Sequence, residues 1–418
     1  MRILYSLLVY ALLPLTVFKL LWRSRKEPAY LHHWAERYGY YVTRPSAPIL
    51  WLHCVSVGET RAAQPLVETL LTHYPHHQIL ITYTTPTGRA TGNSLFSNRV
   101  LSAYLPYDTP FAVQHFLHHF HPVLGALLET ELWPNLIHAC HRNNIPLMLI
   151  NARLSPRSLR RYQHIRWLMC PSLRALSVIA AQSKADAARF KVLGALEVQV
   201  MGNMKSDVIP PSVDVVAGNA MRVQLARSKV WLAASTRVGE EKLIIDAWSS
   251  LTNPPLLILV PRHPERFVAV ADLLDARGIR FVRRSQLGDA PLENDCQVLL
   301  GDSMGEMFRY MVAADIVLMG GSLLPFGGQN LLEALVLAKP VLIGEHTFNF
   351  ADISVAAIQS GAARSVNIGN LATTVQQLLA DDHLCLGMSK AALALSAQRR
   401  GATQWIKLRI DSLLATGG

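Results

Sequence analysis

Residues 49–84, ILWLHCVSVGETRAAQPLVETLLTHYPHHQILITYT, decide the fold class of this chain. Residues 49–55 are an apolar run typical of a buried strand, residues 62–72 repeat apolar side chains at helical spacing, and residues 78–84 are a second apolar run. A strand, a helix and a strand in succession predict two parallel strands joined by a crossover helix. The stretch also carries Glu59, which we expect in the loop between the first strand and the helix.

The same alternation of apolar runs and amphipathic stretches continues along the chain. It pauses over residues 203–220, where Pro210-Pro211 is followed by small and polar residues, and this segment is the expected interdomain linker. The pattern predicts an α/β protein with two doubly wound domains, over 23–208 and 209–418, and a ligand cleft between them. The further strand-like segments are 123–128, 146–150, 230–236, 256–263, 279–284, 296–302, 314–322 and 339–345.

Composition limits the classes of partner and site. The 418 residues carry a net charge of +11, which favours polyanionic partners such as nucleic acid, anionic lipid or phosphorylated ligands. Nucleic acid is disfavoured because the chain has neither zinc-finger spacing nor an RNP motif. The five cysteines form no C-x-x-C pair and the 16 histidines form no H-E-x-x-H motif. We therefore expect a reduced, cytosolic body without a metal site or another cofactor.

The first 22 residues differ from the rest. Residues 3–18 carry no charge, but this run is shorter than the roughly 20 residues of a perpendicular membrane span, and Pro14 interrupts it. A tilted span and a monotopic helix both remain open. The cluster Arg23, Arg25 and Lys26 follows the run and would hold the body on the cytoplasmic side. A cleaved signal peptide is the disfavoured alternative, because no small-residue cleavage site follows the run.

Glu59 has two interpretations on sequence alone. A carboxylate in the first turn of a helix stabilises the helix dipole by about 0.3–1 kcal/mol, which is a structural role. A carboxylate beside apolar strand ends instead has a raised pKa and suits general-base chemistry. The residues by themselves leave both interpretations open.

Residues 320–333, GGSLLPFGGQNLLE, form a glycine-rich loop between a strand and an expected helix over 330–338. Glycines such as Gly321 let the backbone approach a ligand, and free N–H groups at a helix start favour phosphate. Glu333 is placed to accept hydrogen bonds from ribose hydroxyls. No G-K-[ST] follows, so this is not a Walker motif, and a plain turn before a buried helix is the alternative.

Two further stretches follow predicted strands. PRHPERF, residues 261–267, puts Arg262 and His263 at a strand's carboxyl end, where arginine suits phosphate or carboxylate. GDSMGEM, residues 301–307, is more typical of structure: Asp302 and Ser303 look like a helix N-cap, with Glu306 completing a capping box.

Taken together, these stretches resemble the Kdo (3-deoxy-D-manno-octulosonic acid) transferases of Gram-negative bacteria, glycosyltransferases that modify the lipid A precursor. The resemblance extends over nearly the whole chain. It rests on RKEPAYLHHWAERYG, SVGE, TPTG, YLPYD, ETELWPNL, NARLS, AAQS, GNMKSD, PRHPERF, GDSMGE, GGS, GGQNLLEAL and HTFNF. It implies a GT-B fold of two Rossmann-like domains, CMP-Kdo as donor on the C-terminal domain, a lipid A precursor as acceptor on the N-terminal domain, and inverting, metal-independent transfer at the cytoplasmic face of the inner membrane.

The resemblance also implies roles for individual residues. Glu59 corresponds to the family's proposed catalytic base, and Lys205 is a candidate contact to the Kdo carboxylate or the phosphate, with a solvated lysine as the alternative. The implied donor residues are Arg262, His263, Gly321, Ser322, Asn330 and Glu333, and those on the acceptor side are Thr87, Gly88, Glu129 and Arg153.

Two positions depart from the family pattern: Gln329 and Arg237 stand where the family commonly has histidine. Glutamine cannot titrate, which puts any acid role of that side chain in doubt. Two other functions stay open at this point: transfer from a different donor such as a UDP-sugar, and a membrane-bound scaffold that has lost activity.

Overall fold

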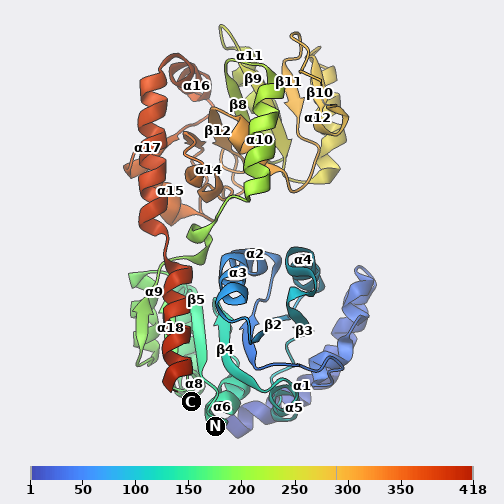
Figure 1. The fold of residues 1–418 in the computed structure, drawn as a ribbon, viewed down its shortest axis with the longest axis vertical. Coiled ribbons are helices and arrows are strands. Elements are labelled where there is room, and N and C mark those ends of the chain that lie inside the picture. Colours follow the sequence, from blue (N-terminus) through green and yellow to red (C-terminus); the bar gives the residue numbers. More distant parts are fainter. Residues whose placement is uncertain (1, 289, 417–418) are drawn as a thin grey trace. The chain divides into compact units, whose positions relative to one another are not determined.

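The chain forms two compact units, each built on its own sheet (Figure 1). The computed structural model describes residues 2–288 and 290–416. The first unit comprises Met1–Asp207 and Arg400–Gly418, and the second comprises Val208–Arg399. In each unit the described residues form one parallel seven-stranded sheet. The predicted fold class, two doubly wound sheets behind an N-terminal apolar helix, is confirmed.

The N-terminal unit has the strand order β3-β2-β1-β4-β5-β6-β7. Strands β1 and β5 are buried along their whole length because helices cover both faces of the sheet, which is why they read as continuous apolar runs. Chain order reverses between β1 and β4, and ligands of such sheets bind beyond the strand ends at this switch point. The strands are β1 (Ile49–His53), β2 (Gln78–Tyr83), β3 (Leu101–Tyr104), β4 (Pro122–Leu128), β5 (Leu147–Ala152), β6 (Val178–Ala181) and β7 (Val198–Val200).

The helices of the N-terminal unit come from the first half of the chain, except for the last helix, which comes from the C-terminal end. The last helix, α18, packs against α3 and buries Ile406 and Ile410 in the core of the N-terminal unit (Figure 1). The α-helices of the N-terminal unit are α1 (Arg2–Ser24), α2 (Val57–Ala62), α3 (Gln64–His73), α4 (Pro86–Phe96), α5 (Pro110–Phe120), α6 (Pro134–Arg142), α7 (Pro156–His164), α8 (Arg166–Arg174), α9 (Lys184–Leu193) and α18 (Ala402–Thr416).

Helix α1 lies along the outside of the N-terminal unit, near α5 and α6 (Figure 1). Hydroxyl groups on one face hydrogen-bond α1 to the rest of the unit. Tyr5 donates to Asp108 at 2.9 Å, Ser6 donates to Asn135 at 3.0 Å, and the Thr16 hydroxyl lies 2.9 Å from that of Tyr38. The other face exposes apolar side chains. Among the described residues, α1 is the one helix long and apolar enough to cross a membrane. The exposed apolar residues are Ile3, Leu4, Leu7, Leu8, Leu12, Leu15, Val17, Phe18, Leu21 and Trp22.

The C-terminal unit has the strand order β10-β11-β9-β8-β12-β13-β14, with its switch point between β8 and β12. Its strands are β8 (Val230–Thr236), β9 (Leu256–Pro261), β10 (Phe281–Arg283), β11 (Val298–Leu300), β12 (Ile316–Met319), β13 (Val341–Ile343) and β14 (Ala363–Ser365). Its helices are α10 (Ser212–Leu225), α11 (Glu240–Ser249), α12 (Phe267–Asp275), α13 (Met307–Ala313), α14 (Leu332–Val336), α15 (Ala351–Gln359), α16 (Leu371–Ala380) and α17 (Asp382–Arg399).

The predicted linker was too long. Helix α10 begins at Ser212, directly after the proline pair, so the second half of 203–220 is α-helical. The small residues that suggested a linker serve packing instead: a Cβ atom on Gly218 would lie 2.6 Å from the Cβ of Val312 on α13. Because Gly218 has no side chain, α10 and α13 can approach closely. Small residues occur both at close helix contacts and in flexible linkers, so local composition alone did not separate the two cases.

Two predicted helices also differ from the structure. The expected helix 62–72 is two helices, α2 and α3, which meet at Ala63, and Pro65 in the first turn of α3 has no N–H to continue a single ladder. Glu59 therefore lies inside α2 and not in a loop before a helix. The expected helix 330–338 is the five-residue α14, which is flanked by turns and followed by a left-handed residue at Ala338.

Candidate functional site

Glu59 lies just past the carboxyl end of β1, at the switch point of the N-terminal sheet. Ser56 caps α2, and its hydroxyl donates to Oε1 of Glu59 at 3.0 Å. The backbone N–H of Val55 donates to Oε2 at 2.8 Å. These two donors hold the carboxylate in place, yet burial dominates and raises the pKa of Glu59 to about 7. A carboxyl that is half ionised near neutrality has the proton affinity that general-base catalysis needs.

Two further acidic side chains, from the segment after β4, lie near this carboxyl. The charges of Glu129 and Glu131 add to the rise in the pKa of Glu59. Burial also raises the pKa of Glu131, whose Oε2 accepts from the indole N–H of Trp133 at 2.9 Å and lies 3.9 Å from Nε2 of His53. His53 is fully buried, and burial lowers its pKa to about 4, so its ring is neutral at pH 7. His53 therefore adds no positive charge beside Glu131 at neutral pH.

Gly88 fits α4 tightly against the loop that carries Glu59. Thr85 caps α4 by accepting from the N–H of Gly88 at 3.1 Å, and its hydroxyl donates to the carbonyl of Val55 at 3.0 Å. A Cβ atom on Gly88 would lie 2.9 Å from that Thr85 hydroxyl, closer than real side chains pack. Gly88 thus positions the backbone around Glu59, whereas Thr87 is exposed on the first turn of α4.

Glu129, directly after β4, and Asn151, within β5, adopt left-handed backbone conformations, with φ of 60° and 51°. Non-glycine residues rarely adopt this conformation, which concentrates at functional sites. Oδ1 of Asn151 accepts from the N–H of Met204 at 3.1 Å, and its carbonyl accepts from Gln182. Its side-chain nitrogen is buried without a hydrogen-bond partner among the described residues. Asn151 therefore offers an unused donor beside the strand ends.

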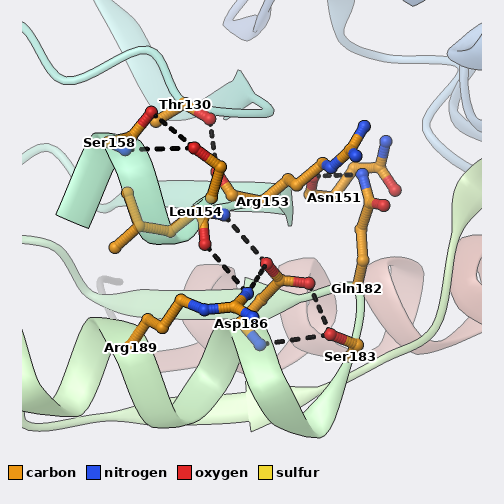
Figure 2. Close-up of polar contacts among 10 residues, drawn as sticks. Thr130, Asn151, Arg153, Leu154, Ser158, Gln182, Ser183, Asp186 and Arg189 are labelled. Atoms are coloured by element: carbon orange, nitrogen blue, oxygen red, sulfur yellow. Dashed lines mark hydrogen bonds and ion pairs between the residues drawn. The ribbon is translucent and has the colours of Figure 1, made fainter. Parts of the chain in front are cut away.

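Figure 2 shows the loop after β5, where the exposed Arg153 precedes a buried network. Asp186 accepts from the N–H of Leu154 at 3.0 Å and pairs with Arg189 at 3.1 Å, and Ser183 donates to its other oxygen at 2.5 Å. This network fixes the backbone on which Arg153 stands. It leaves the guanidinium of Arg153 accessible to an incoming anion.

Lys205 belongs to the N-terminal unit and not to a linker. It lies in a short 3-10 turn, Met204–Asp207, within the N-terminal unit. Its Nζ is 3.9 Å from Oε1 of Glu129, and both side chains are about one-third exposed. The contact brings two of the predicted residues together beside the Glu59 cluster.

In the C-terminal unit, Arg237 connects three loops at the carboxyl ends of the strands. Its guanidinium donates to Nε2 of His263 at 2.8 Å and stacks 5.0 Å from the ring centre of Phe326. These partners come from the segment after β9 and from the glycine-rich loop after β12. The departure from the family pattern at this position thus makes defined contacts, and His263 is occupied by Arg237 in the described state.

Glu240, which the sequence reasoning missed, organises the glycine-rich loop. Its carboxylate is fully buried and accepts from the backbone N–H groups of Gly321 at 2.6 Å, Leu323 at 2.9 Å and Arg237 at 2.9 Å. Burial raises the pKa of Glu240, although these hydrogen bonds oppose the rise. The stretch STRVGE, residues 235–240, held the signal that could have found it, because a glutamate that follows a glycine shortly after a strand suits this anchoring role.

Gly321 and Ser322 support the loop in different ways. Gly321 has φ of +70°, and a Cβ atom there would lie 3.2 Å from Nε2 of Gln329. Ser322 is fully buried, and its hydroxyl accepts from the N–H of Gly344 at 2.8 Å. Among the predicted donor residues, Ser322 therefore acts through the fold of the loop, while Gly321 lies next to Arg237 and Gln329.

The other predicted donor residues lie at the same edge of the C-terminal sheet. The N–H of Arg262 donates to the carbonyl of Thr236, and its side chain is exposed. Oδ1 of Asn330 accepts from the N–H of Leu332 at 3.2 Å, and Glu333 is half-buried in the first turn of α14. Because α14 has only five residues, its dipole is a weak phosphate anchor, and the charge for an anion must come mainly from side chains.

The GDSMGEM stretch does not form the predicted helix cap. Helix α13 begins at Met307 with Glu306 at its N-cap position, so Asp302 and Ser303 lie in the preceding turn. There Ser303 donates to Glu306 at 2.5 Å and Asp302 accepts from Ser285, which is a structural role. Within residues 2–288 and 290–416, no group of three or more His, Cys, Asp or Glu side chains is arranged to hold a metal ion.

Comparison with known proteins identifies the family. The family model for 3-deoxy-D-manno-octulosonic-acid transferase (kdotransferase) matches residues 32–208. The chain is 39% identical over 416 residues to a 3-deoxy-D-manno-octulosonic acid transferase of Bordetella pertussis, covering 96% of both chains. It is 38% identical over 413 residues to the transferase of that name from Haemophilus influenzae, again covering 96% of each.

Solved structures show the same architecture at low identity. A UDP-GlcNAc 2-epimerase from Neisseria meningitidis is 16% identical, with a TM-score of 0.59 over 87% of this chain and all of that one. A glycosyltransferase from Rickettsia africae is 14% identical, with a TM-score of 0.57 over 90% of this chain and all of that one. These likenesses support the GT-B-type fold. Identity of 38–39% to two named enzymes, over nearly the full length of each chain, shows more than the fold. The chain belongs to the family of 3-deoxy-D-manno-octulosonic acid transferases.

Proposed function

We propose that this protein transfers Kdo from CMP-Kdo to the sugar headgroup of a lipid A precursor, lipid IVA, with inversion at the anomeric carbon. The observation that carries the proposal is the Glu59 carboxyl, held at the switch point by Val55 and Ser56 with a pKa of about 7. The relatives named as Kdo transferases over nearly the whole chain support this donor and this reaction class.

The reaction needs one base and one stabilised leaving group. Glu59 takes the proton from a glucosamine 6-hydroxyl as that oxygen bonds to the anomeric carbon of Kdo. The bond from this carbon to the CMP phosphate breaks, and CMP leaves with the electron pair. In this scheme Arg262 stabilises the phosphate charge, and Glu333 accepts hydrogen bonds from the ribose hydroxyls. No step requires a metal ion.

In this proposal Arg153 and Glu129 have roles on the acceptor side, and Lys205 contacts the Kdo carboxylate or the phosphate. Glu129 holds Lys205 at 3.9 Å, close enough to orient the ammonium but too far for a tight ion pair, so the lysine remains available to a carboxylate or phosphate. Arg153 is exposed above its fixed backbone and suits an acceptor phosphate.

We infer that α1 lies in the cytoplasmic leaflet of the inner membrane and does not cross it. Three hydroxyl residues along one face, Tyr5, Ser6 and Thr16, hydrogen-bond to the N-terminal unit. A helix that crossed the bilayer would forfeit these contacts, and Asp108 and Asn135 would lose the hydroxyl groups that now hydrogen-bond to them. The opposite, apolar face is exposed for its length and supports insertion between lipid chains.

Transfer by the purified full-length enzyme tests the proposal. Incubation with CMP-Kdo and lipid IVA is expected to give a lipid heavier by whole Kdo units in a mass spectrum, whose number the experiment also determines. Glu59→Gln should abolish transfer while CMP titration is unchanged, because the base acts in the transition state. Transfer near the wild-type rate by that variant would refute the role of Glu59.

The donor assignment has a separate test. Arg262→Ala and Glu333→Ala should each weaken CMP binding about tenfold or more, since a charge-assisted hydrogen bond contributes about 1.5–3 kcal/mol. Titration of UDP alongside CMP distinguishes the alternative donor class. Tighter binding of UDP than of CMP, or unchanged CMP affinity in both variants, would contradict the assignment.

A further inference from the structure

A cavity of about 590 Å³ lies in the N-terminal unit between α1, α5 and α6. Its volume is in the range of about 300–1,000 Å³ that is typical of small-ligand sites. The wall combines two guanidinium groups, Arg2 and Arg142, with the apolar side chains of Ile3 and Leu7, which are 73% and 61% exposed. The polar remainder of the wall is Ser6, Gln114, Asn135, His138 and Asn143.

The two guanidinium groups lack a direct counter-charge. Neither Arg2 nor Arg142 forms an ion pair with another of the described residues. Burial lowers the pKa of Arg2, and the charge of Arg142 lowers it further. The nearby acid is Asp108, whose carboxylate already accepts from the Tyr5 hydroxyl and from two backbone N–H groups at the start of α6. An anion between the two arginines would relieve their mutual repulsion.

The basic part of the cavity is distant from the candidate catalytic residues of the same unit. Arg142 is the last residue of the nine-residue α6, while Glu131 lies just before this helix begins. A rise of about 1.5 Å per residue separates the two ends by about 13 Å. A headgroup held by Arg142 is therefore not the hydroxyl-bearing sugar that faces Glu59.

We propose that this cavity binds one anionic phospholipid of the membrane, with its phosphate between Arg2 and Arg142 and its acyl chains along Ile3 and Leu7. The inference rests on the membrane contact proposed for α1. A phospholipid fits better than a free anion because the cavity wall passes directly into the exposed apolar face of α1. The bound lipid would complete the surface that α1 presents to the leaflet.

Two measurements on the full-length protein test this site. The first is cosedimentation with phosphatidylcholine vesicles, with and without about one-fifth phosphatidylglycerol. The second is calorimetric titration with dihexanoyl-phosphatidylglycerol below its micelle concentration, with dihexanoyl-phosphatidylcholine and inorganic phosphate in parallel. The double variant Arg2→Gln/Arg142→Gln should bind the anionic vesicles and the short-chain anionic lipid about tenfold more weakly. Thermal unfolding by circular dichroism verifies that the variant is folded.

The matched control removes two positive charges from the exposed surface of α9, in Lys184→Gln/Lys191→Gln, and should bind as the wild type does. Equal losses in the two double variants would indicate net charge alone and overturn the site. Equal affinity for phosphate and for the anionic lipid would overturn its lipid specificity. Absence of vesicle binding by the wild type would refute the membrane proposal for α1, while the short-chain titration would still decide whether the cavity binds the lipid.

Discussion

At the scale of single residues, the surroundings of Glu59 set both its reactivity and its energetic cost. A base must be ionised to accept a proton, and the pKa of this carboxyl is about 7. We therefore expect kcat/KM to rise as pH increases from 6 to 8, with the midpoint of the rise near 7. A pH series with lipid IVA in detergent measures the profile. A flat profile over this range would contradict general-base catalysis by Glu59.

The raised pKa of Glu59 also predicts how stability changes with pH. Most carboxylates have a lowered pKa in the folded state and stabilise it as pH rises, whereas Glu59 should do the opposite. The folded pKa of about 7 lies above the ordinary glutamate pKa of 4.5, so the folded state binds the proton more tightly than the unfolded state. Ionised Glu59 then destabilises the fold as pH rises from about 4.5 through 7. At pH 8, Glu59→Gln should raise the unfolding free energy by about 2–3 kcal/mol and should therefore raise the melting temperature. At pH 4.5 it should have little effect.

Thermal melts of the wild type and of Glu59→Gln at both values of pH check this expectation. Thr87→Ala, a substitution at an exposed position on the neighbouring helix, serves as the control and should give no pH-dependent difference. A variant that is less stable than the wild type at pH 8 would show that the hydrogen bonds from Val55 and Ser56 outweigh burial.

Sequence reasoning reached Glu59 because a carboxylate at a strand-to-helix junction is visible in the chain itself. It did not reach His53, Glu131 or Asn151, because the burial, the pKa change and the left-handed backbone of these residues arise only when β1, β4 and β5 lie side by side. Ser322 shows the converse: its place in a glycine-rich loop suggested ligand contact, but the folded loop buries its hydroxyl.

At the scale of elements, Glu240 connects the start of α11 to the loop after β12. Glu240→Ala would leave the N–H groups of Arg237, Gly321 and Leu323 without their acceptor, at a cost of about 1–3 kcal/mol for each buried group. We expect a loss of at least about 3 kcal/mol in unfolding free energy and weaker CMP binding. Urea unfolding and CMP titration measure the two effects.

Glu241→Gln is the matched control for this prediction. Glu241 is also buried, but its recorded partners are the hydroxyl of Thr236 and the side chain of Arg266, and none is in the glycine-rich loop. It should lower stability without the same loss of CMP affinity. Equal effects on CMP binding from both substitutions would mean that Glu240 does not act through the loop.

Most strands were predictable because full burial in a parallel sheet demands uninterrupted apolar runs. Helices were less so. The division between α2 and α3 depends on one proline, and the early start of α10 depends on close packing against α13, which two distant segments decide together. The short α14 has the same cause, since its flanking turns are set by the glycine-rich loop and not by helical propensity.

At the scale of the whole molecule, the two faces of α1 separate membrane contact from folding. Replacing Leu8, Leu15 and Phe18 with glutamine should shift the protein towards the soluble fraction and lower activity on acceptor in bilayers more than on acceptor in detergent, because only lipid chains are available to these side chains. Leu20→Gln is the contrasting variant: Leu20 is 5% exposed, so this change should lower the melting temperature. Equal losses of activity in bilayer and detergent for the triple variant would contradict a membrane role.

The return of α18 to the N-terminal unit sets an order of events during synthesis on the ribosome. Asp207 accepts from the N–H groups of Gly401 and Thr403, and Ile406 and Ile410 fill the core around β1 and β4. The unit translated first thus remains incomplete until α18 has been synthesised and released, whereas Val208–Arg399 contains all of its own elements. A chain cut before residue 400 would therefore keep every element of the second unit but would leave the core of the first unit open around β1 and β4.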